Sequence, residues 1–174
     1  MRVVVSSDKQ QIGGGSKPFD LRENPRAIAQ IDAARQHPAF GGLLVNLNSE
    51  ESPFFTLACK LWSSIESAEI EPDVFSSRID LEMRVETGLT GQSQYEDLAR
   101  RLAELLEREP GDALRVELHI APTGFADVRQ GYCLRLVLCA CGKGEQQARL
   151  RWTLGIARMQ QALLFLARAI RQNR

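Results

Sequence analysis

The residues with the greatest chemical potential are one histidine and three cysteines in the C-terminal half of the chain. They are His119, Cys133, Cys139 and Cys141. Imidazole and thiolate are ligands that zinc prefers, and a cysteine beside a histidine is a pair used in nucleophilic catalysis. Either chemistry requires these side chains to meet, so their positions on the expected strands decide whether a zinc site or a catalytic pair can form.

The spacing of the thiols argues against a zinc site. Cys139 and Cys141 lie two residues apart on one side of an expected strand, which separates their Cβ atoms by about 6.5–7 Å. Tetrahedral zinc requires its sulfur ligands roughly 3.8 Å apart. For a catalytic pair of His119 with Cys133, the sequence offers no helix N-terminus to activate the thiol or bind an oxyanion. We therefore expect no cofactor, and a Cys/His-based enzyme or zinc-binding protein remains the alternative hypothesis.

A second set of residues could recognise negative charge. It consists of four arginines with one glutamate among them: Arg115, Glu117, Arg135, Arg149 and Arg151. The guanidinium fork matches a carboxylate or a phosphate. If these side chains share the exposed face of a sheet, they predict a docking surface for an acidic protein or a small anionic ligand. The simpler interpretation is a solvated network of salt bridges.

Both sets depend on three strands expected between Leu114 and Leu154. Apolar and polar residues alternate over 114–120, 132–140 and 148–154, which is the period of strands with one buried face. Between the last two, Gly142-Lys143-Gly144 fits a three-residue hairpin loop whose final glycine takes a positive φ.

The loops predict how these strands pair. A hairpin at residues 142–144 places Arg135 opposite Arg151 and Val137 opposite Arg149. An earlier hairpin centred near Ala126 places His119 opposite Cys133 and Glu117 opposite Arg135. A slip of one residue would move Trp152 from the core into water, so the register of the last strand is well constrained.

From Ile156 onward the apolar residues follow a helical period. The stripe contains Ile156, Met159, Leu163, Leu166, Ala167 and Ile170, and Leu164 and Phe165 widen it. A band this wide covers more than one neighbour. We expect this helix to pack on the sheet and on a second helix, with a homodimer through the 156–171 helix as the alternative.

The N-terminal half gives weaker signals. Arg2–Ser6 fits an edge strand, and residues 7–17 fit a flexible Gly-rich loop or arm. Asn24-Pro25 begins a helix that Pro38 ends. Residues 40–47 and 54–65 fit either a helix or a strand, and we favour a helix for the first and a strand for the second.

The middle of the chain is clearer. Ile79, Leu81, Met83 and Val85 alternate with charged residues as a strand with one solvated face. Ser93 and Glu96 form a capping box that opens a helix, and Pro110-Gly111 stops it. The expected fold class is α+β, with a single mostly antiparallel sheet of about five strands and helices packed on one face.

Length and composition limit the possible functions. A chain of 174 residues is expected to form one globular domain spanning residues 1–174. Its formal net charge of zero excludes a protein that binds polyanions strongly over its whole surface. Nucleic acid is not an expected partner, because the arginine face lacks aromatic stacking residues. No apolar run is long enough to span a membrane, and no signal peptide is evident, so we expect a cytoplasmic protein with reduced cysteines.

These observations favour a non-enzymatic interaction module that uses the Arg-bearing sheet face. No phosphate-binding loop, HExxH motif, serine elbow or dinucleotide fingerprint is present. The motifs that would identify common classes of enzyme are therefore absent.

Overall fold

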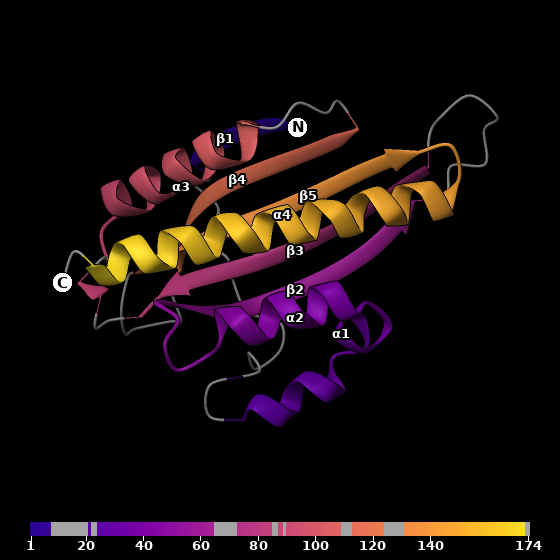
Figure 1. Ribbon diagram of the computed structural model, residues 1–174. Helices are drawn as coiled ribbons and strands as arrows, with labels where there is room; N and C mark the ends of the chain where they lie inside the picture. The colour runs from indigo at the N-terminus through magenta and orange to yellow at the C-terminus, as the bar shows by residue number, and fades with distance from the viewer. Residues whose placement is uncertain are drawn as a thin grey trace.

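Five strands form one mixed sheet in the computed structural model (Figure 1). The structure describes residues 1–7, 21, 24–64, 73–84, 87–88, 90–108, 113–123 and 131–172. The strands are β1 (Arg2–Ser7), β2 (Phe54–Ser64), β3 (Asp73–Met83), β4 (Leu114–Thr123) and β5 (Gly131–Gly142), in the spatial order β1-β4-β5-β3-β2. β1 runs parallel to β4, and every other neighbouring pair is antiparallel. The expected α+β class is confirmed, but the sheet is not purely antiparallel.

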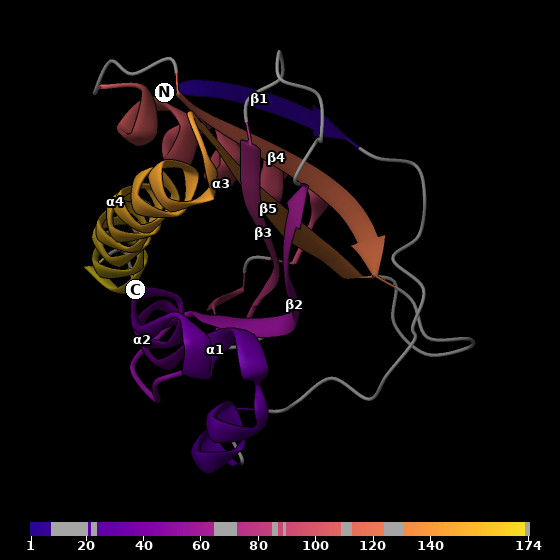
Figure 2. The ribbon, with the colours of Figure 1, turned by 90° about the vertical axis from the view of Figure 1, so that its right-hand side faces the viewer.

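The three longer helices cover the same face of the sheet (Figure 2). They are α2 (Pro38–Leu47), α3 (Gln92–Glu107) and α4 (Glu145–Gln172), and a 3-10 helix (Pro25–Gln30) and α1 (Asp32–Gln36) precede them. Most strand residues that point toward these helices are buried and apolar, for example Val116, Leu118 and Ile120 on β4. Their neighbours point away from the helices and include the charged residues of the sheet. The period-2 pattern of the sequence thus reflects one helix-covered face and one uncovered face.

Trp152 of α4 is the centre of the core. Its side chain is fully buried, and its ring contacts the rings of Phe75 on β3 (centroids 4.9 Å apart) and Phe40 on α2 (5.9 Å). Its indole N–H donates a hydrogen bond of 2.9 Å to Oγ of Ser77 on β3. One aromatic side chain therefore joins α4, α2 and the sheet, with its polar group satisfied.

The strand expected over residues 148–154 is wrong, because these residues are helical. α4 begins at Glu145 and continues without interruption to Gln172. Its buried residues are Ala148, Trp152, Gly155, Ile156, Met159, Ala162, Leu163, Leu166 and Ala167, which follow the helical period. Leu150 and Leu154, expected in the core, are exposed instead. The expected pairings of Arg151 with Arg135 and of Arg149 with Val137 do not occur.

The turn before α4 has the expected glycine with a positive φ, but it does not close a hairpin. Gly144 has φ of +102°, as expected for the last residue of the loop, but the turn leads from β5 into a helix. Gly142 lies directly under the first turn of that helix, where an added Cβ would be 2.3 Å from the backbone nitrogen of Ala148. Both glycines are needed for the chain to reverse this tightly.

The two ambiguous segments adopt the favoured structures. Residues 40–47 lie in α2, and most of 54–65 lies in β2. The side chain of Asn48 joins them: its Oδ1 accepts from the backbone N–H of Thr56, and its Nδ2 donates to the Leu44 carbonyl. His37, which precedes Pro38, is extended as expected, but Pro38 also begins the next helix.

Other boundaries differ from the expectations. The helix expected at Ser93 begins at Gln92, and its cap is a hydrogen bond of 2.8 Å from the Gly91 N–H to Oε1 of Gln94, so the Ser93–Glu96 box is wrong. Except for Ser7, the residues expected to form a Gly-rich loop (7–17) lie outside the described residues, as does Pro110-Gly111.

The wide apolar band of α4 contacts the sheet and also α2 and α3, which confirms the expected second helix. None of the helices in the described part of the chain is long and apolar enough to cross a membrane.

Two glycine substitutions should have opposite effects on stability. Gly142→Ala should lower the free energy of unfolding by more than about 1 kcal/mol, because the new methyl group meets backbone atoms that cannot rotate away. Gly42→Ala, in an exposed position of α2 with nothing within 4 Å, should raise it by about 0.5–1 kcal/mol. Urea unfolding of both variants measures the difference. Equal stability of the two variants would contradict this description of the β5–α4 turn.

Candidate functional site

The face of the sheet that lacks helices carries three rows of side chains across all five strands, called here the open face. Each row lists residues on β1, β4, β5, β3 and β2 in that order. The first row is Ser6, His119, Arg135, Asp80 and Ala58; the second is Val4, Glu117, Val137, Arg78 and Lys60; the third is Arg2, Arg115, Cys139, Ser76 and Trp62. Together they combine charged groups, a hydroxyl, an imidazole and a thiol on one surface.

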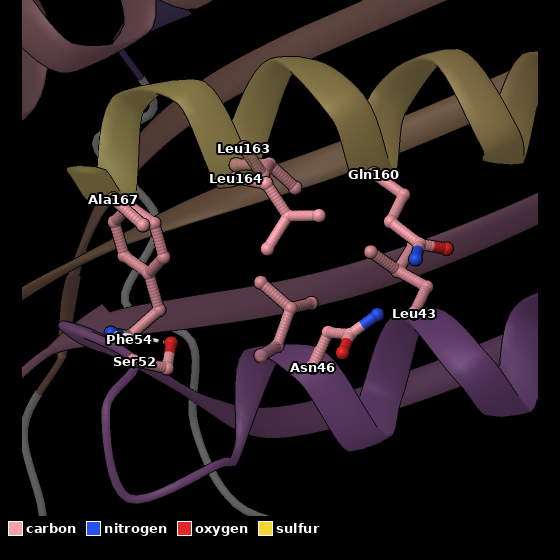
Figure 3. Close-up of a pocket in the computed structure, with 9 residues that line it drawn as sticks. Leu43, Asn46, Ser52, Phe54, Gln160, Leu163, Leu164 and Ala167 are labelled. Carbon is pink, nitrogen blue, oxygen red and sulfur yellow. Dashed lines mark hydrogen bonds between the residues drawn. The ribbon is translucent and has the colours of Figure 1, made fainter. Parts of the chain in front are cut away.

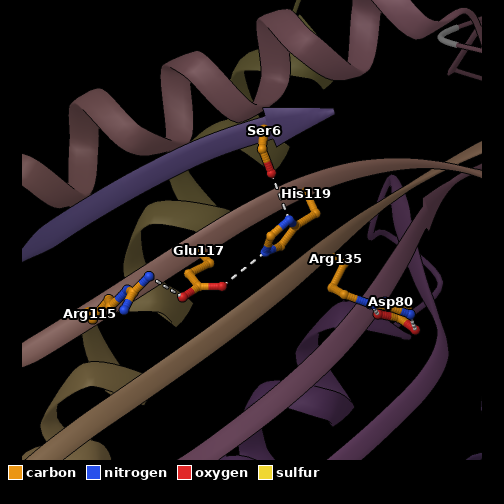
Figure 4. Close-up of polar contacts among 6 residues, drawn as sticks. All are labelled: Ser6, Asp80, Arg115, Glu117, His119 and Arg135. Carbon is orange, nitrogen blue, oxygen red and sulfur yellow. Dashed lines mark hydrogen bonds and ion pairs between the residues drawn. The ribbon is translucent and has the colours of Figure 1, made fainter. Parts of the chain in front are cut away.

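The first row contains a buried carboxylate. Asp80 is 0% exposed, and Arg135 donates to both of its oxygens, from Nε at 2.8 Å and from Nη2 at 3.1 Å (Figure 4). Nε of Arg78 lies 3.6 Å from the same carboxylate and is buried without a hydrogen-bond partner among the described residues. A buried charge is tolerated only when it is paired and hydrogen-bonded, so Arg135 is needed to keep Asp80 in place.

The same row begins with a chain of polar contacts between β1 and β4. Oγ of Ser6 lies 2.7 Å from Nδ1 of His119, and Nε2 of His119 lies 3.1 Å from Oε2 of Glu117. The other oxygen of Glu117 forms an ion pair with Nη2 of Arg115, 2.8 Å away (Figure 4). A neutral imidazole that donates from Nε2 to the carboxylate accepts at Nδ1 from the hydroxyl. Hydroxyl, imidazole and carboxylate are thus connected in order.

The thiols do not form a cluster with His119. Cys133 is fully buried opposite Ala121, Cys139 lies opposite Arg115, and Cys141 lies beyond it opposite Val74. Burial raises the pKa of the Cys133 thiol to about 12 and also raises that of Cys139. Such thiols carry little thiolate near neutral pH, which makes them weak nucleophiles. Within the described residues, no group of three or more potential metal ligands comes together.

The structure brings together only part of the expected site. Arg115, Glu117, His119 and Arg135 share the open face, but β4 and β5 pair two residues further along than expected. His119 lies opposite Arg135 rather than Cys133, and Glu117 lies opposite Val137 rather than Arg135. A shift of two residues keeps every side chain on its expected face, so the face is right and the partners are wrong.

Arg149 and Arg151 lie elsewhere, on α4. Arg149 pairs with Glu145 one turn earlier and lies over the ring of Phe75, 5.5 Å from its centroid. Arg151 donates from Nη1 to the carbonyl of Cys141 at 2.6 Å. Both arginines lie in the first two turns of α4, and neither belongs to the open face.

Five of the polar residues of the open face were absent from the expected site. Ser6 was missed because the parallel pairing of β1 with β4 leaves no local signal in the sequence. Arg2, Lys60 and Arg78 were missed because their rows depend on strand order and on the irregularity in β2 between Thr56 and Ala58. Asp80 was visible as a charged residue of an expected strand, but it was not assigned to the site.

A shallow groove of about 210 Å³ lies between α2 and α4 on the opposite side of the molecule (Figure 3). Its walls are mainly apolar, from Leu43, Leu163 and Phe54, and its one hydroxyl, on Ser52, accepts from the Phe54 N–H. None of the described residues that line the groove has a titratable side chain. It offers no chemistry comparable with that of the open face.

Comparison with models of protein families, with curated proteins and with solved structures found no match.

Two of the ion pairs of the open face should differ in their effect on stability. Arg135→Met should lower the free energy of unfolding by about 3–5 kcal/mol, because the carboxylate of Asp80 has no access to water. Arg115→Met, at a pair whose arginine side chain is 58% exposed, should cost below about 1 kcal/mol. Urea unfolding tests both. If Arg115→Met lowered the free energy of unfolding as much as Arg135→Met, the description of Asp80 as a buried carboxylate that depends on Arg135 would be contradicted.

Proposed function

We propose that the protein is a binding module whose open face docks an acidic segment of a protein partner. The support comes from the charge of this face and from the way that its basic residues are placed. The three rows hold five basic side chains, on Arg2, Lys60, Arg78, Arg115 and Arg135, against the carboxylates of Asp80 and Glu117. The formal charge of the whole chain is zero, so this excess is local.

The observation that carries the proposal is the pairing of like charges on neighbouring strands. Lys60 lies directly opposite Arg78, and Arg2 lies directly opposite Arg115. Like charges in such positions destabilise a sheet. An acidic partner that binds between them would remove this repulsion.

The ion pairs already present do not use up the donors of this face. Glu117 engages one terminal nitrogen of Arg115, whose side chain remains 58% exposed. Lys60 and Arg2 are also exposed. Exposed arginines held by a neighbouring carboxylate are oriented in advance for a second anion, which reduces the entropy lost on binding.

The breadth of the surface favours a protein segment over a small anion. The basic residues lie on all five strands, so a single phosphate or carboxylate reaches only a few of them. Trp62 at the β2 edge is 38% exposed and adds an apolar contact, so the expectation that this face lacks aromatic side chains is wrong. Basic side chains with an aromatic anchor are typical of protein-binding surfaces.

Binding of a fluorescein-labelled poly-L-glutamate peptide, measured by fluorescence anisotropy, tests the proposal. The double variant Lys60→Glu/Arg115→Glu should weaken binding by roughly tenfold or more, because it reverses two charges of the face. The affinity of the unmodified protein should fall as the salt concentration rises.

The matched control is Arg101→Glu/Arg108→Glu, which makes the same change of charge on exposed residues of α3 and its C-terminal end. It should leave the affinity within about twofold of the unmodified protein, since these residues lie on the helix-covered side. An equal loss in both double variants would mean that only net charge matters and would contradict the proposal. Competition by free glutamate at the same concentration of carboxylates would indicate a small anion as the ligand.

The homodimer through the 156–171 helix stays a prediction, and exposed side chains on α4 favour it. Phe165 is 61% exposed, and Leu150, Leu154 and Leu164 are also exposed. Leu150, Leu154, Ala157, Gln161 and Leu164 follow one another at intervals of four and three residues, the spacing with which one helix packs along a second.

Sedimentation equilibrium checks this prediction. The unmodified protein should show a mass that rises with concentration toward twice that of the chain, and Leu154→Glu/Phe165→Glu should remain monomeric. The control is Val45→Glu, at a residue on α2 that is 55% exposed, and this variant should dimerise like the unmodified protein. A monomer at all concentrations would exclude the dimer.

A further inference from the structure

Ser6, His119 and Glu117 have the order of contacts that activates a serine. The hydroxyl lies 2.7 Å from one ring nitrogen of the imidazole, and the carboxylate lies 3.1 Å from the other (Figure 4). A nucleophile within hydrogen-bond reach of a base, with the base oriented by a third group, is the general signature of covalent catalysis. Such sets occur on unrelated folds and are recognised by geometry rather than by sequence order.

Rigid elements hold each member of the set. Ser6 on β1 and His119 on β4 are directly paired neighbours in the parallel ladder, and Glu117 lies two residues before His119 on the same face of β4. Arg115 engages Oε1 of Glu117 and leaves Oε2 to the imidazole. The ring is therefore held from both sides, which fixes the tautomer that accepts a proton from the serine.

Burial alone does not explain these contacts. The side chains of His119 and Glu117 are 23% and 24% exposed, and Ser6 is also partly exposed. Water could satisfy groups with this much access, so no penalty of desolvation forces them to pair. The same exposure allows a reagent to reach the hydroxyl.

We propose that Ser6 is a nucleophile toward activated esters, with His119 as its general base and Glu117 as the residue that positions the imidazole. This inference does not rest on the proposed binding function, since it concerns the β1–β4 end of the open face and a covalent step.

Ser6, His119 and Glu117 can account for each bond and proton transfer of ester hydrolysis. The Ser6 Oγ–carbon bond forms while its proton moves to Nδ1 of His119, and the carboxylate of Glu117 stabilises the imidazolium through Nε2–H. The bond to the leaving oxygen then breaks, and the proton passes from Nδ1 to that oxygen, which leaves as an alcohol. Water, deprotonated by the same nitrogen, hydrolyses the acyl-serine and restores the hydroxyl.

Reaction of the full chain with a fluorophosphonate probe tests the proposal. The phosphorus–oxygen bond to serine forms as fluoride leaves, and the adduct is located by intact mass and by peptide mapping. We expect one adduct per chain, on Ser6. His119→Gln should slow labelling by about a hundredfold or more, since general-base catalysis contributes roughly that much.

Two further variants separate catalysis from a structural role. Glu117→Gln retains an acceptor for Nε2–H but removes the charge that stabilises the imidazolium, so it should slow labelling by roughly tenfold with an unchanged urea midpoint. The matched control is Ser63→Ala, at an exposed serine of β2, which should leave the rate within about twofold.

A second measurement applies if the histidine variant is unstable. In Ser6→Cys, with His119 intact, the introduced thiol should react with iodoacetamide faster than Cys139, whose thiol pKa is raised by burial. Labelling of Ser6 no faster than of Ser63, labelling unaffected by His119→Gln, or an introduced thiol no faster than Cys139 would each overturn the proposal.

Discussion

The burial of Trp152 is the constraint on which the rest of the structure depends. Its ring lies among aromatic side chains of α2 and β3, and its indole N–H is satisfied by Ser77. A side chain of this size can be buried only if α4 crosses the middle of the sheet, with α2 beside it. Because the apolar helices are thereby gathered on one face, the opposite face is left to the polar residues of the strands.

The same residue explains why the sequence is misleading between Ala148 and Leu154. A strand repeats every two residues, and a helical face can repeat every four, so Ala148, Trp152 and Ile156 fit both patterns. Leu150 and Leu154 would share the buried face with them only in a strand, but they are exposed. The preceding glycines permit either a hairpin or a turn into a helix. Over so short a segment, alternation cannot distinguish a buried strand from an amphipathic helix whose outer face is also apolar.

The strands themselves were predictable because each has one buried face. Alternation identified β3, β4 and β5 and assigned most side chains to the correct side. In β2 it failed halfway along, because the irregularity between Thr56 and Ala58 exchanges the two faces. Phe54 and Thr56 point toward the helices, and Lys60 and Trp62 point away from them. Periodicity therefore predicts on which face of the sheet a side chain lies, and says much less about which residue of the neighbouring strand it pairs with.

The open face combines two arrangements that local patterns do not contain. The pairing of Asp80 with Arg135 requires β3 to lie beside β5, and the contact of Ser6 with His119 requires β1 to lie beside β4. In both cases strand order, rather than composition, creates the site. A buried carboxylate and a hydroxyl paired with an imidazole can occur on one surface because the strands that carry them are rigid and closely spaced.

The parallel position of β1 also has a consequence for the way in which the chain folds. Ser6 and His119 are separated by 113 residues, so the first strand cannot pair until its neighbour has been synthesised and has found its own place. Contacts between such distant segments form slowly, because closing the intervening loop costs entropy before any contact repays it. The N-terminal strand should therefore be among the last elements to dock, and any reactivity of its serine would appear only once folding is complete.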